Sequence, residues 1–258
     1  MNNLFDVSGK IALVTGGANG LGRMIVEGLI EAGATVYFTS RKPEDCARTE
    51  QELSTKGRCH GIAADISTPE AASALARDIS EKEPALHILI NNAGKTWGAP
   101  LESFPDKAWG GVMSVNVQAP FTLIRDLLPN LRNAGTRADP ARIINIGSIA
   151  GAAAERLSAY SYAASKAAIH HLSHVLAADL ASDNITVNAI LPGYFPTQMT
   201  SHIRAEEDKL GELIERVPLG RLGASSDIAG ACIFLSSKAG AYVTGVELSV
   251  DGGMLGCR

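Results

Sequence analysis

Seven short runs rich in β-branched residues alternate with longer segments of helical pattern along the chain. The runs are KIALVT, TVYFT, CHGIAAD, LHILIN, RIINIGS, ITVNAI and VELSVDGG. Such alternation predicts βαβ units and a parallel sheet. The runs are apolar on both faces, which is typical of strands that helices cover on both sides. We therefore expect an α/β fold with a doubly wound parallel sheet of about seven strands in three layers.

The number of domains is not decided by length, since 258 residues could form one large domain or two small ones. No linker rich in Pro, Gly and Ser and no internal repeat interrupts the series of strands. The segment RNAGTRADPA, residues 132–141, predicts only a loop before the fifth strand. One domain, residues 1–258, is the better interpretation.

Residues 194–218 break the alternation after the sixth strand. Apolar residues recur there among charges at helix-like spacing: Phe195, Met199, Ile203, Leu210 and Ile214. This pattern predicts a small helical flap, and a plain pair of surface helices is the alternative. A flap here would lie at the carboxyl edge of the sheet, where open α/β folds bind ligands.

Composition and charge exclude several classes of protein. A net charge of -4 gives no basic footprint for nucleic acid or an anionic membrane. No stretch approaches the roughly 20 apolar residues of a membrane-spanning helix, and the N-terminus lacks the pattern of a signal peptide. The four scattered cysteines form no C-x-x-C pair, so they indicate neither a zinc site nor a disulfide framework. A reducing, cytoplasmic location fits best.

A glycine-rich turn, GGANGLG, follows the first predicted strand and precedes an amphipathic segment. Such a turn exposes backbone N–H groups at the positive end of a helix dipole, where phosphates bind. Gly16, Gly20 and Gly22 would permit the turn, the approach of a phosphate and helix packing. Because the spacing is not the usual G-x-G-x-x-G, a plain glycine-rich turn stays an alternative.

The end of the second predicted strand bears on the choice of dinucleotide. An NAD site has an acidic residue there, whereas an NADP site has a basic residue for the 2′-phosphate. In the sequence TSRK, Ser40 occupies the acidic position and Arg41 follows it. A guanidinium can bind a phosphate through two hydrogen bonds. We expect NADP(H) rather than NAD(H), with a merely solvated Arg41 as the alternative.

Five short motifs occur in the order and approximate spacing of one known family. They are TGGANGLG at 15–22, NNAG at 91–94, GS at 147–148, YAASK at 162–166 and PG at 192–193. Over about residues 8–253 the chain thereby resembles the short-chain dehydrogenase/reductases. The resemblance implies a Rossmann-like fold, an NAD(P)-dependent oxidoreductase acting on CH–OH groups, and a homotetramer.

The YAASK motif places a phenol and an ammonium four residues apart on one helix face. The ammonium of Lys166 and an oxidised nicotinamide would both lower the pKa of Tyr162, which could then donate a proton to a carbonyl oxygen. Ser148, at the end of the fifth strand, could hydrogen-bond the same oxygen. The resemblance adds Asn116 as the anchor of a water that links Lys166 to bulk solvent.

The resemblance also implies which residues line the cofactor site. They surround the phosphates, the adenosine and the nicotinamide: Gly16, Asn19, Gly20, Leu21, Gly22, Ser40, Arg41, Asp65, Ile66, Asn92, Ala93, Gly94, Tyr162, Lys166, Ile190, Pro192, Gly193 and Thr197. A strand-end cap is the alternative role for Asp65, and a structural role is the alternative for Asn92. The family further places residues 251–253, DGG, near a subunit interface.

Three further segments resemble bacterial 3-oxoacyl (β-ketoacyl) thioester reductases of the rhamnolipid-associated type: TWGAPLESFPDKAW, INIGSIAG and PGYFPTQMT. They predict reduction of a 3-oxoacyl thioester or related ketone, with Trp97, Ser148, Tyr162 and Tyr194 contacting the substrate. The alternatives are an NAD-dependent alcohol, polyol or steroid dehydrogenase and, more remotely, a non-catalytic dinucleotide sensor.

The chain departs from this group at its carrier-binding residues. Reductases that serve acyl carrier protein tend to have basic residues along the helix after YAASK, where this chain has Asp179 and Asp183. Docking of acyl carrier protein is therefore doubtful, although Arg132, Arg137 and Arg142 could form a different basic patch. Asn19 also stands where NADP-binding members often have a basic residue, so the 2′-phosphate assignment depends on Arg41.

The sequence HHLSH places His170 and His174 four residues apart. It lacks the acidic second residue of H-E-x-x-H and an evident third ligand, so we expect no metal site. A position on a helix face or at a subunit interface explains these histidines better.

Overall fold

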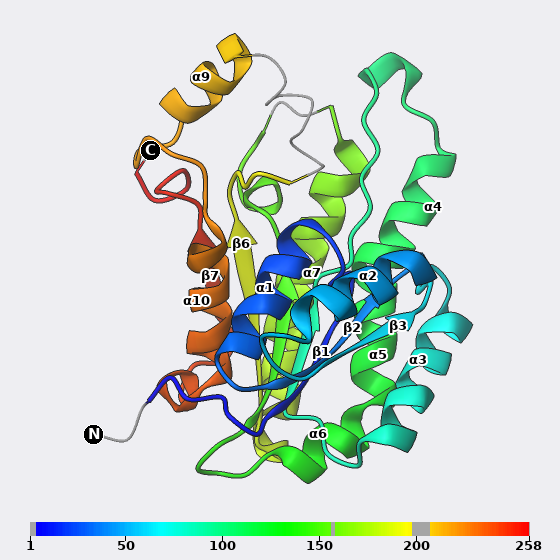
Figure 1. The fold of residues 1–258 in the computed structure, drawn as a ribbon. Helices are drawn as coiled ribbons and strands as arrows, with labels where there is room; N and C mark the ends of the chain where they lie inside the picture. The colour runs from blue at the N-terminus through cyan, green and yellow to red at the C-terminus, as the bar shows by residue number, and fades with distance from the viewer. Residues whose placement is uncertain (1–3, 156–157, 198–206, 258) are drawn as a thin grey trace.

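A computed structural model describes residues 4–155, 158–197 and 207–257. Within these residues, seven parallel strands form one sheet in the order β3-β2-β1-β4-β5-β6-β7 (Figure 1). They are β1 Ile11–Val14, β2 Thr35–Ser40, β3 Cys59–Ala63, β4 Ile88–Asn91, β5 Ala141–Ile146, β6 Ile185–Pro192 and β7 Glu247–Val250. Each contains residues of one predicted run, so the prediction of the sheet is confirmed.

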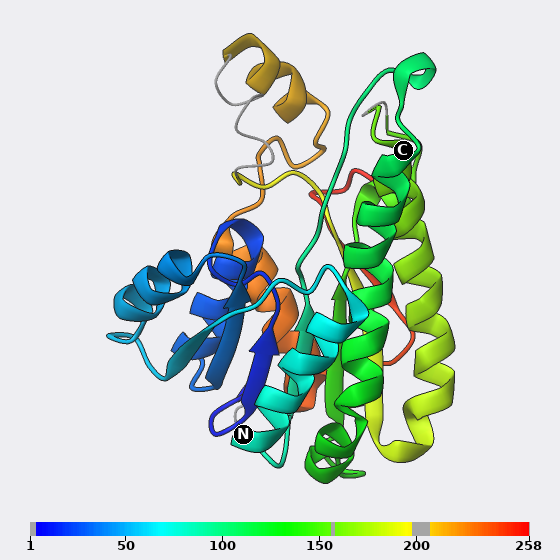
Figure 2. The same cartoon turned by 90° about the vertical axis from the view of Figure 1, so that its right-hand side faces the viewer.

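Helices cover both faces of the sheet, which gives the three predicted layers (Figure 2). One face packs against α1 Gly20–Glu31, α2 Pro43–Leu53 and α10 Ser225–Ser236. The other face packs against α3 Pro69–Lys82, α5 Ala119–Asp126, α6 Leu128–Ala134 and α7 Tyr160–Leu180. The remaining helical segments are η1 Leu101–Ser103, α4 Lys107–Met113, η2 Ser114–Gln118, η3 Ile149–Gly151, η4 Ala181–Asp183, α9 Glu207–Glu215 and η6 Lys238–Gly240.

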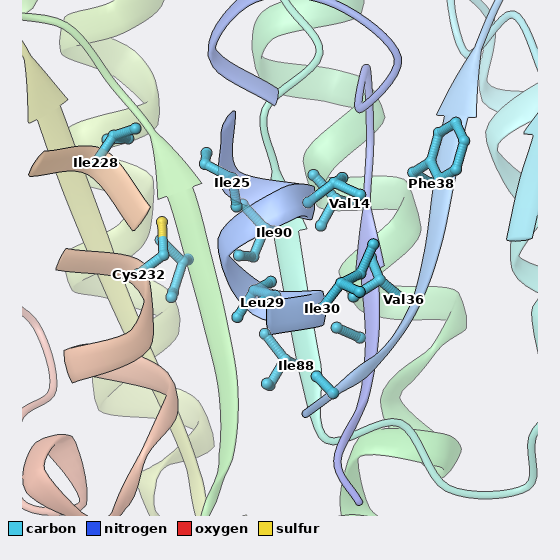
Figure 3. Packing of buried hydrophobic residues seen from close by; sticks show 14 of the residues in the cluster. Val14, Ile25, Leu29, Ile30, Val36, Phe38, Ile88, Ile90, Ile228 and Cys232 are labelled. Carbon is cyan, nitrogen blue, oxygen red and sulfur yellow. The ribbon is translucent and has the colours of Figure 1, made fainter. Parts of the chain in front are cut away.

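Each central strand supplies apolar side chains to both faces of the sheet. In β4, Ile88 and Ile90 pack toward α1 and α10, whereas Leu89 packs toward the opposite helices. Figure 3 shows the first of these clusters, in which Leu29 of α1 and Cys232 of α10 meet the strands. Burial of a leucine or isoleucine side chain stabilises a fold by about 2 kcal/mol. This arrangement explains why the strands lack strict alternation in sequence.

The predicted flap region contains one described helix, α9. Leu213 and Val217 are the buried residues at this helix and the turn after it, whereas Leu210 and Ile214 are half-buried. Met199 and Ile203 lie outside the described residues. Val217 packs with Ile149 and Met254, so the end of the flap region contacts the segment directly after β5.

The described residues contain neither a membrane-spanning helix nor a metal-binding cluster. None of their helices combines the length and the apolar character needed to cross a membrane. They also contain no group of three or more His, Cys, Asp or Glu side chains placed to hold a metal ion. All four cysteines carry free thiols.

Candidate active site

The predicted catalytic side chains meet beyond the carboxyl end of β5. Tyr162 and Lys166 lie one turn apart on α7, and the Lys166 ammonium is 5.6 Å from the centroid of the Tyr162 ring. The Lys166 Nζ donates a hydrogen bond of 2.6 Å to the carbonyl oxygen of Ile146, the last residue of β5. Ser148 follows two residues later, and its hydroxyl lies close enough to the Tyr162 phenol to lower the pKa of that phenol. The fold therefore brings these three predicted residues together from two elements.

Burial dominates the electrostatics of this group. It lowers the pKa of Lys166 to about 8. Burial also raises the pKa of Tyr162, and the Ser148 hydroxyl only partly opposes this effect. Among the protein's own groups, desolvation of the phenolate outweighs the stabilisation by its neighbours, and the further lowering of this pKa by an oxidised nicotinamide stays a prediction. The phenol is accordingly held as an acid.

Asn116 connects the catalytic helix to the loop after β4. It is buried in the π-helical segment η2, and such segments often mark functional sites. Its side-chain oxygen accepts a hydrogen bond from Lys95 N at 2.8 Å, and its amide nitrogen donates to Lys95 O at 2.9 Å and Ser165 Oγ at 2.8 Å. Ser165 Oγ in turn donates to the carbonyl oxygen of Tyr162 at 2.7 Å. The side chain thus joins the loop to the first turn of the catalytic face.

The glycine-rich turn between β1 and α1 has the conformation expected of a phosphate site. Gly16 and Gly20 adopt φ values of 67° and 54°, which favour glycine. A Cβ at Gly22 would overlap the carbonyl oxygen of Gly16, so the helix approaches the turn closely. Asn19 makes no side-chain cap of α1, and the first turn of this helix has no acidic residue. The N–H groups of the first turn of α1 are therefore oriented toward a region that favours an anion.

The NNAG motif holds this turn in place. The Asn92 amide donates to the carbonyl oxygens of Thr15 and Gly16 at 2.9 and 3.1 Å. The Thr15 hydroxyl accepts from the backbone nitrogens of Asn92 and Ala93, both at 3.0 Å. Asn92 therefore has the structural role that the sequence left open as an alternative. A Cβ at Gly94 would lie 3.8 Å from Lys166 Nζ, so this motif also reaches the catalytic lysine.

The other end of the predicted cofactor site, near β2 and β3, is more exposed. Ser40 ends β2, and the Arg41 side chain that follows it is exposed. The Asn19 amide donates to Asp45 Oδ2 at 3.2 Å, which connects the glycine-rich turn to α2.

Three other residues predicted near the cofactor serve the fold through their side chains. Asp65 accepts a hydrogen bond from Ser67 N at 3.0 Å, in the manner of the strand-end cap considered above. Ile66 is buried in the core on the α3 side of the sheet, and Leu21 packs against the core on the α1 side.

The opposite end of the site lies after β6. Ile190 and Pro192 are buried within that strand, and a Cβ at Gly193 would lie 2.8 Å from Asp251 Cα. Asp251 accepts hydrogen bonds from the backbone nitrogens of Gly253 and Leu255, which closes the DGG turn. Thr197 faces the glycine-rich turn, since a Cβ at Gly20 would lie 3.5 Å from the Cβ of Thr197.

A buried carboxylate, Glu155, connects Tyr194 to Arg216 at the predicted substrate end of the site. The sequence did not single out this residue. Tyr194 donates its hydroxyl to Glu155 Oε2 at 3.1 Å, and Arg216 donates to the same oxygen at 3.0 Å. Glu155 lies in the loop before α7, and Arg216 directly follows α9, so this cluster ties the flap region to two active-site loops. No local motif identifies Glu155, because both partners are distant in sequence.

The loop after β4 carries an aromatic cluster beside the site. Trp97 is 43% exposed. Phe104 packs edge-to-face against Tyr160, with centroids 5.3 Å apart, and against Trp109 at 6.3 Å. Tyr160 thus anchors the loop against the start of α7, whereas Tyr162 two residues later belongs to the catalytic group.

The structure removes Arg142 from the suggested basic patch and pairs Arg132 with an acid. Arg142 is fully buried, where it donates hydrogen bonds to the carbonyl oxygens of Leu235 and Ser237. Arg132 pairs with Asp183 at 2.8 Å, which neutralises both charges. Of the three arginines considered, Arg142 is a core residue because its guanidinium satisfies backbone carbonyls at the end of α10.

Comparisons with known proteins agree with this geometry. The family model described as "Enoyl-(Acyl carrier protein) reductase" matches residues 16–255. A Pseudomonas aeruginosa rhamnolipids biosynthesis 3-oxoacyl-(acyl-carrier-protein) reductase is 46% identical over 253 residues, which cover 98% of this chain and 99% of that protein. The chain belongs to the short-chain dehydrogenase/reductase family. It is therefore an oxidoreductase of this family, as its motifs predicted.

Solved structures of other family members share the fold and differ in their named substrates. The Pseudomonas aeruginosa RhlG/NADP active-site complex superimposes with a TM-score of 0.96, at 46% identity over 98% of this chain and 99% of that one. A gluconate 5-dehydrogenase from Burkholderia cenocepacia in complex with NADP and tartrate has a TM-score of 0.89 and 31% identity, with 97% of both chains covered. Short-chain dehydrogenase/reductases of both kinds thus resemble this protein along most of their length.

Proposed function

We propose that the protein uses NADPH to reduce the carbonyl group of a 3-oxoacyl thioester or a related ketone to the 3-hydroxy product. The observation that carries this proposal is the assembly of Ser148, Tyr162 and Lys166 beside the glycine-rich turn. The 46% identical relative is named as a 3-oxoacyl reductase, which supports this choice of substrate class. The residues of the whole chain, 1–258, would act as one domain.

The proposed proton transfer follows from the bonds around Tyr162. Ser148 and Tyr162 would both donate hydrogen bonds to the substrate carbonyl oxygen, and Tyr162 would pass its proton to that oxygen. With the pKa of Lys166 at about 8, its ammonium is mostly charged at pH 7 and would stabilise the phenolate that remains. Bound NADPH would supply the hydride. Asn116 would hold the loop and the helix at the spacing that this geometry needs, and anchor the water that serves Lys166.

The features of the cofactor region fit a phosphorylated dinucleotide. The α1 N-terminus would receive the pyrophosphate, and Arg41 would bind the 2′-phosphate next to Ser40. No carboxylate occupies the ribose position at the end of β2, which disfavours NAD(H). Structures of three relatives are described as containing NADP, which supports the same choice.

The substrate would enter between Trp97 and Tyr194. Neither the exposed Asp179 nor the Arg132–Asp183 pair offers a basic surface for an acidic carrier protein. We therefore propose a free ketone or a coenzyme A thioester as substrate, and we expect docking of acyl carrier protein to be weak. A cytoplasmic homotetramer remains our proposal for location and assembly.

A sugar-acid dehydrogenase is the second candidate. A Bacillus subtilis 2-dehydro-3-deoxy-D-gluconate 5-dehydrogenase is 36% identical over 256 residues, covering 99% of this chain and 98% of that protein. The higher identity of 46% to the 3-oxoacyl reductase favours the thioester or ketone.

The test is a panel of 3-oxoacyl thioesters, simple ketones and sugar acids, each assayed with NADPH and NADH. Faster turnover of 3-oxo compounds with NADPH is the expected result. Preference for a sugar acid would favour the second candidate. If no compound of the panel is turned over while the protein still binds NADPH, the result would support the non-catalytic sensor.

A further inference from the structure

His170 continues the face of α7 that carries Tyr162 and Lys166. It follows Lys166 by four residues, one helical turn, so the three side chains point the same way. It is 3% exposed and lies on the inner face of the helix, which excludes a subunit interface for this side chain. The other histidine of the pair, His174, is exposed, so the interface prediction stays open for that residue. The proposed proton transfer does not use His170, so its burial beside the active site requires another explanation.

The His170 ring contacts the backbone of the proposed catalytic serine. Its Nε2 accepts a hydrogen bond of 3.2 Å from Ser148 N. The ring also occupies the space that side chains at two neighbouring positions would fill. A Cβ at Gly147 would lie 2.6 Å from the His170 Cδ2, and a Cβ at Gly151 would lie 2.8 Å from Cε1. The segment from Gly147 to Gly151 therefore wraps around the imidazole.

The hydrogen bond to Ser148 N requires an unprotonated Nε2. In the neutral ring the proton must then reside on Nδ1, and a Glu247 carboxylate oxygen lies 3.7 Å from that atom. The other Glu247 oxygen is 3.3 Å from His174 Nε2. Burial, followed by the charges of Lys166 and His174, lowers the pKa of His170 to about 4. The ring is neutral near pH 7 and can accept.

Other bonds hold α7 against the rest of the fold. Asn145 of β5 donates its amide to Ser173 Oγ at 2.9 Å, one turn further along the helix. Asn116 holds Ser165 at the other end of the catalytic face. The position of the helix is therefore fixed without His170, whereas the His170 bond acts on the Ser148 backbone itself.

We propose that His170 is a positioning residue that holds the Ser148 backbone at a fixed distance from the catalytic face of α7. The hydroxyl of Ser148 is thereby aimed at the Tyr162 phenol and at the oxygen of the substrate. This inference rests on the proposed function, in which Ser148 binds the carbonyl oxygen.

The test compares two substitutions of similar size. His170→Met fills the space and offers no strong acceptor to Ser148 N, whereas the amide oxygen of His170→Gln can replace Nε2. We expect His170→Met to lower kcat by about 10- to 100-fold, the effect of a displacement on the order of 1 Å. The Kd for NADPH should stay within twofold, and His170→Gln should recover most of the loss. His171→Met, at the exposed neighbouring position, is the control and should leave kcat unchanged.

A second measurement separates positioning from general damage to the fold. If His170 acts through Ser148, His170→Met should cost little further activity in a Ser148→Ala background, because coupled residues are not additive. Additive losses in the double variant would overturn the proposal, as would equal losses in His170→Met and His170→Gln.

A third readout does not depend on turnover, so it distinguishes failure of this inference from failure of the proposed function. Crystal structures of His170→Met and the wild type should differ in the separation of Ser148 Oγ and Tyr162 Oη. An unchanged separation would refute the positioning role, whatever substrate the enzyme proves to use.

Discussion

The two ends of the proposed site are built differently. Around Tyr162 the groups are buried and held by several hydrogen bonds, from Asn116 on one side to His170 on the other. Around Arg41 the side chains are exposed, and Asn19 is connected to α2 through one amide bond to Asp45. In the proposed mechanism, proton transfer would thus be preorganised by the core, whereas selection of the dinucleotide would depend on surface groups. Substitutions at the first end should alter turnover and stability, and those at the second end should alter affinity.

The largest effect is expected for Tyr162→Phe. Removal of the hydroxyl eliminates the proposed proton donor, so kcat should fall by about 10³-fold or more while NADPH still binds. Steady-state kinetics and a fluorescence titration of NADPH measure the two quantities. Tyr160→Phe retains the ring that packs on Phe104 and is the matched control. Residual activity above a tenth of the wild-type value would show that another group donates the proton.

The substitution Arg41→Ala tests the exposed end. Loss of a charged hydrogen-bond donor to the 2′-phosphate should raise the KM for NADPH by about 10- to 100-fold and leave that for NADH nearly unchanged. Arg58→Ala, an exposed arginine directly before β3 and remote from the carboxyl edge, should change neither value. An unaltered KM for NADPH would show that the 2′-phosphate is bound elsewhere.

Lys166→Met should stabilise the fold while it abolishes activity. The pKa of Lys166 is about 8 in the folded protein and 10.5 in the reference state, so the unfolded chain binds more protons between these values. Wild-type stability therefore rises with pH across this window, and at pH 7 the charged lysine costs about 3 kcal/mol. Urea unfolding at pH 7 should show this gain in the variant. Equal stability of the two proteins would contradict the predicted cost of burial.

The loss of folding stability at acidic pH should depend on His170. Its pKa is about 4 in the folded protein and 6.5 in the reference state, so the unfolded chain binds the extra proton as the pH falls through this range. Wild-type stability should therefore decrease by about 2 kcal/mol between pH 7 and pH 4.5. His170→Gln should reduce this decrease, and His60→Gln, at an exposed position, should not. Parallel pH profiles for all three proteins would argue that His170 is protonated when folded.

The sheet and the proximity of Tyr162 to Lys166 could be predicted from sequence because local patterns encode them. The seven apolar runs and the four-residue spacing of Tyr162 and Lys166 are such patterns. His170, Glu155 and Arg142 could not be placed, since each is a polar side chain whose burial depends on partners far along the chain. Arg142, for example, is held by a carbonyl oxygen 93 residues away. The sequence also did not single out Leu213, which is buried on α9.

The catalytic face belongs to one continuous helix of 21 residues, whereas the substrate end is assembled from the loop after β4 and the segment around α9. Helical pitch places the phenol, the amine and the imidazole on one face, and bonds to β5 and the segment after it fix the amine and the imidazole. Exchange of either loop with that of a sugar-acid relative should therefore retarget the enzyme to new molecules while its proton-transfer apparatus stays intact.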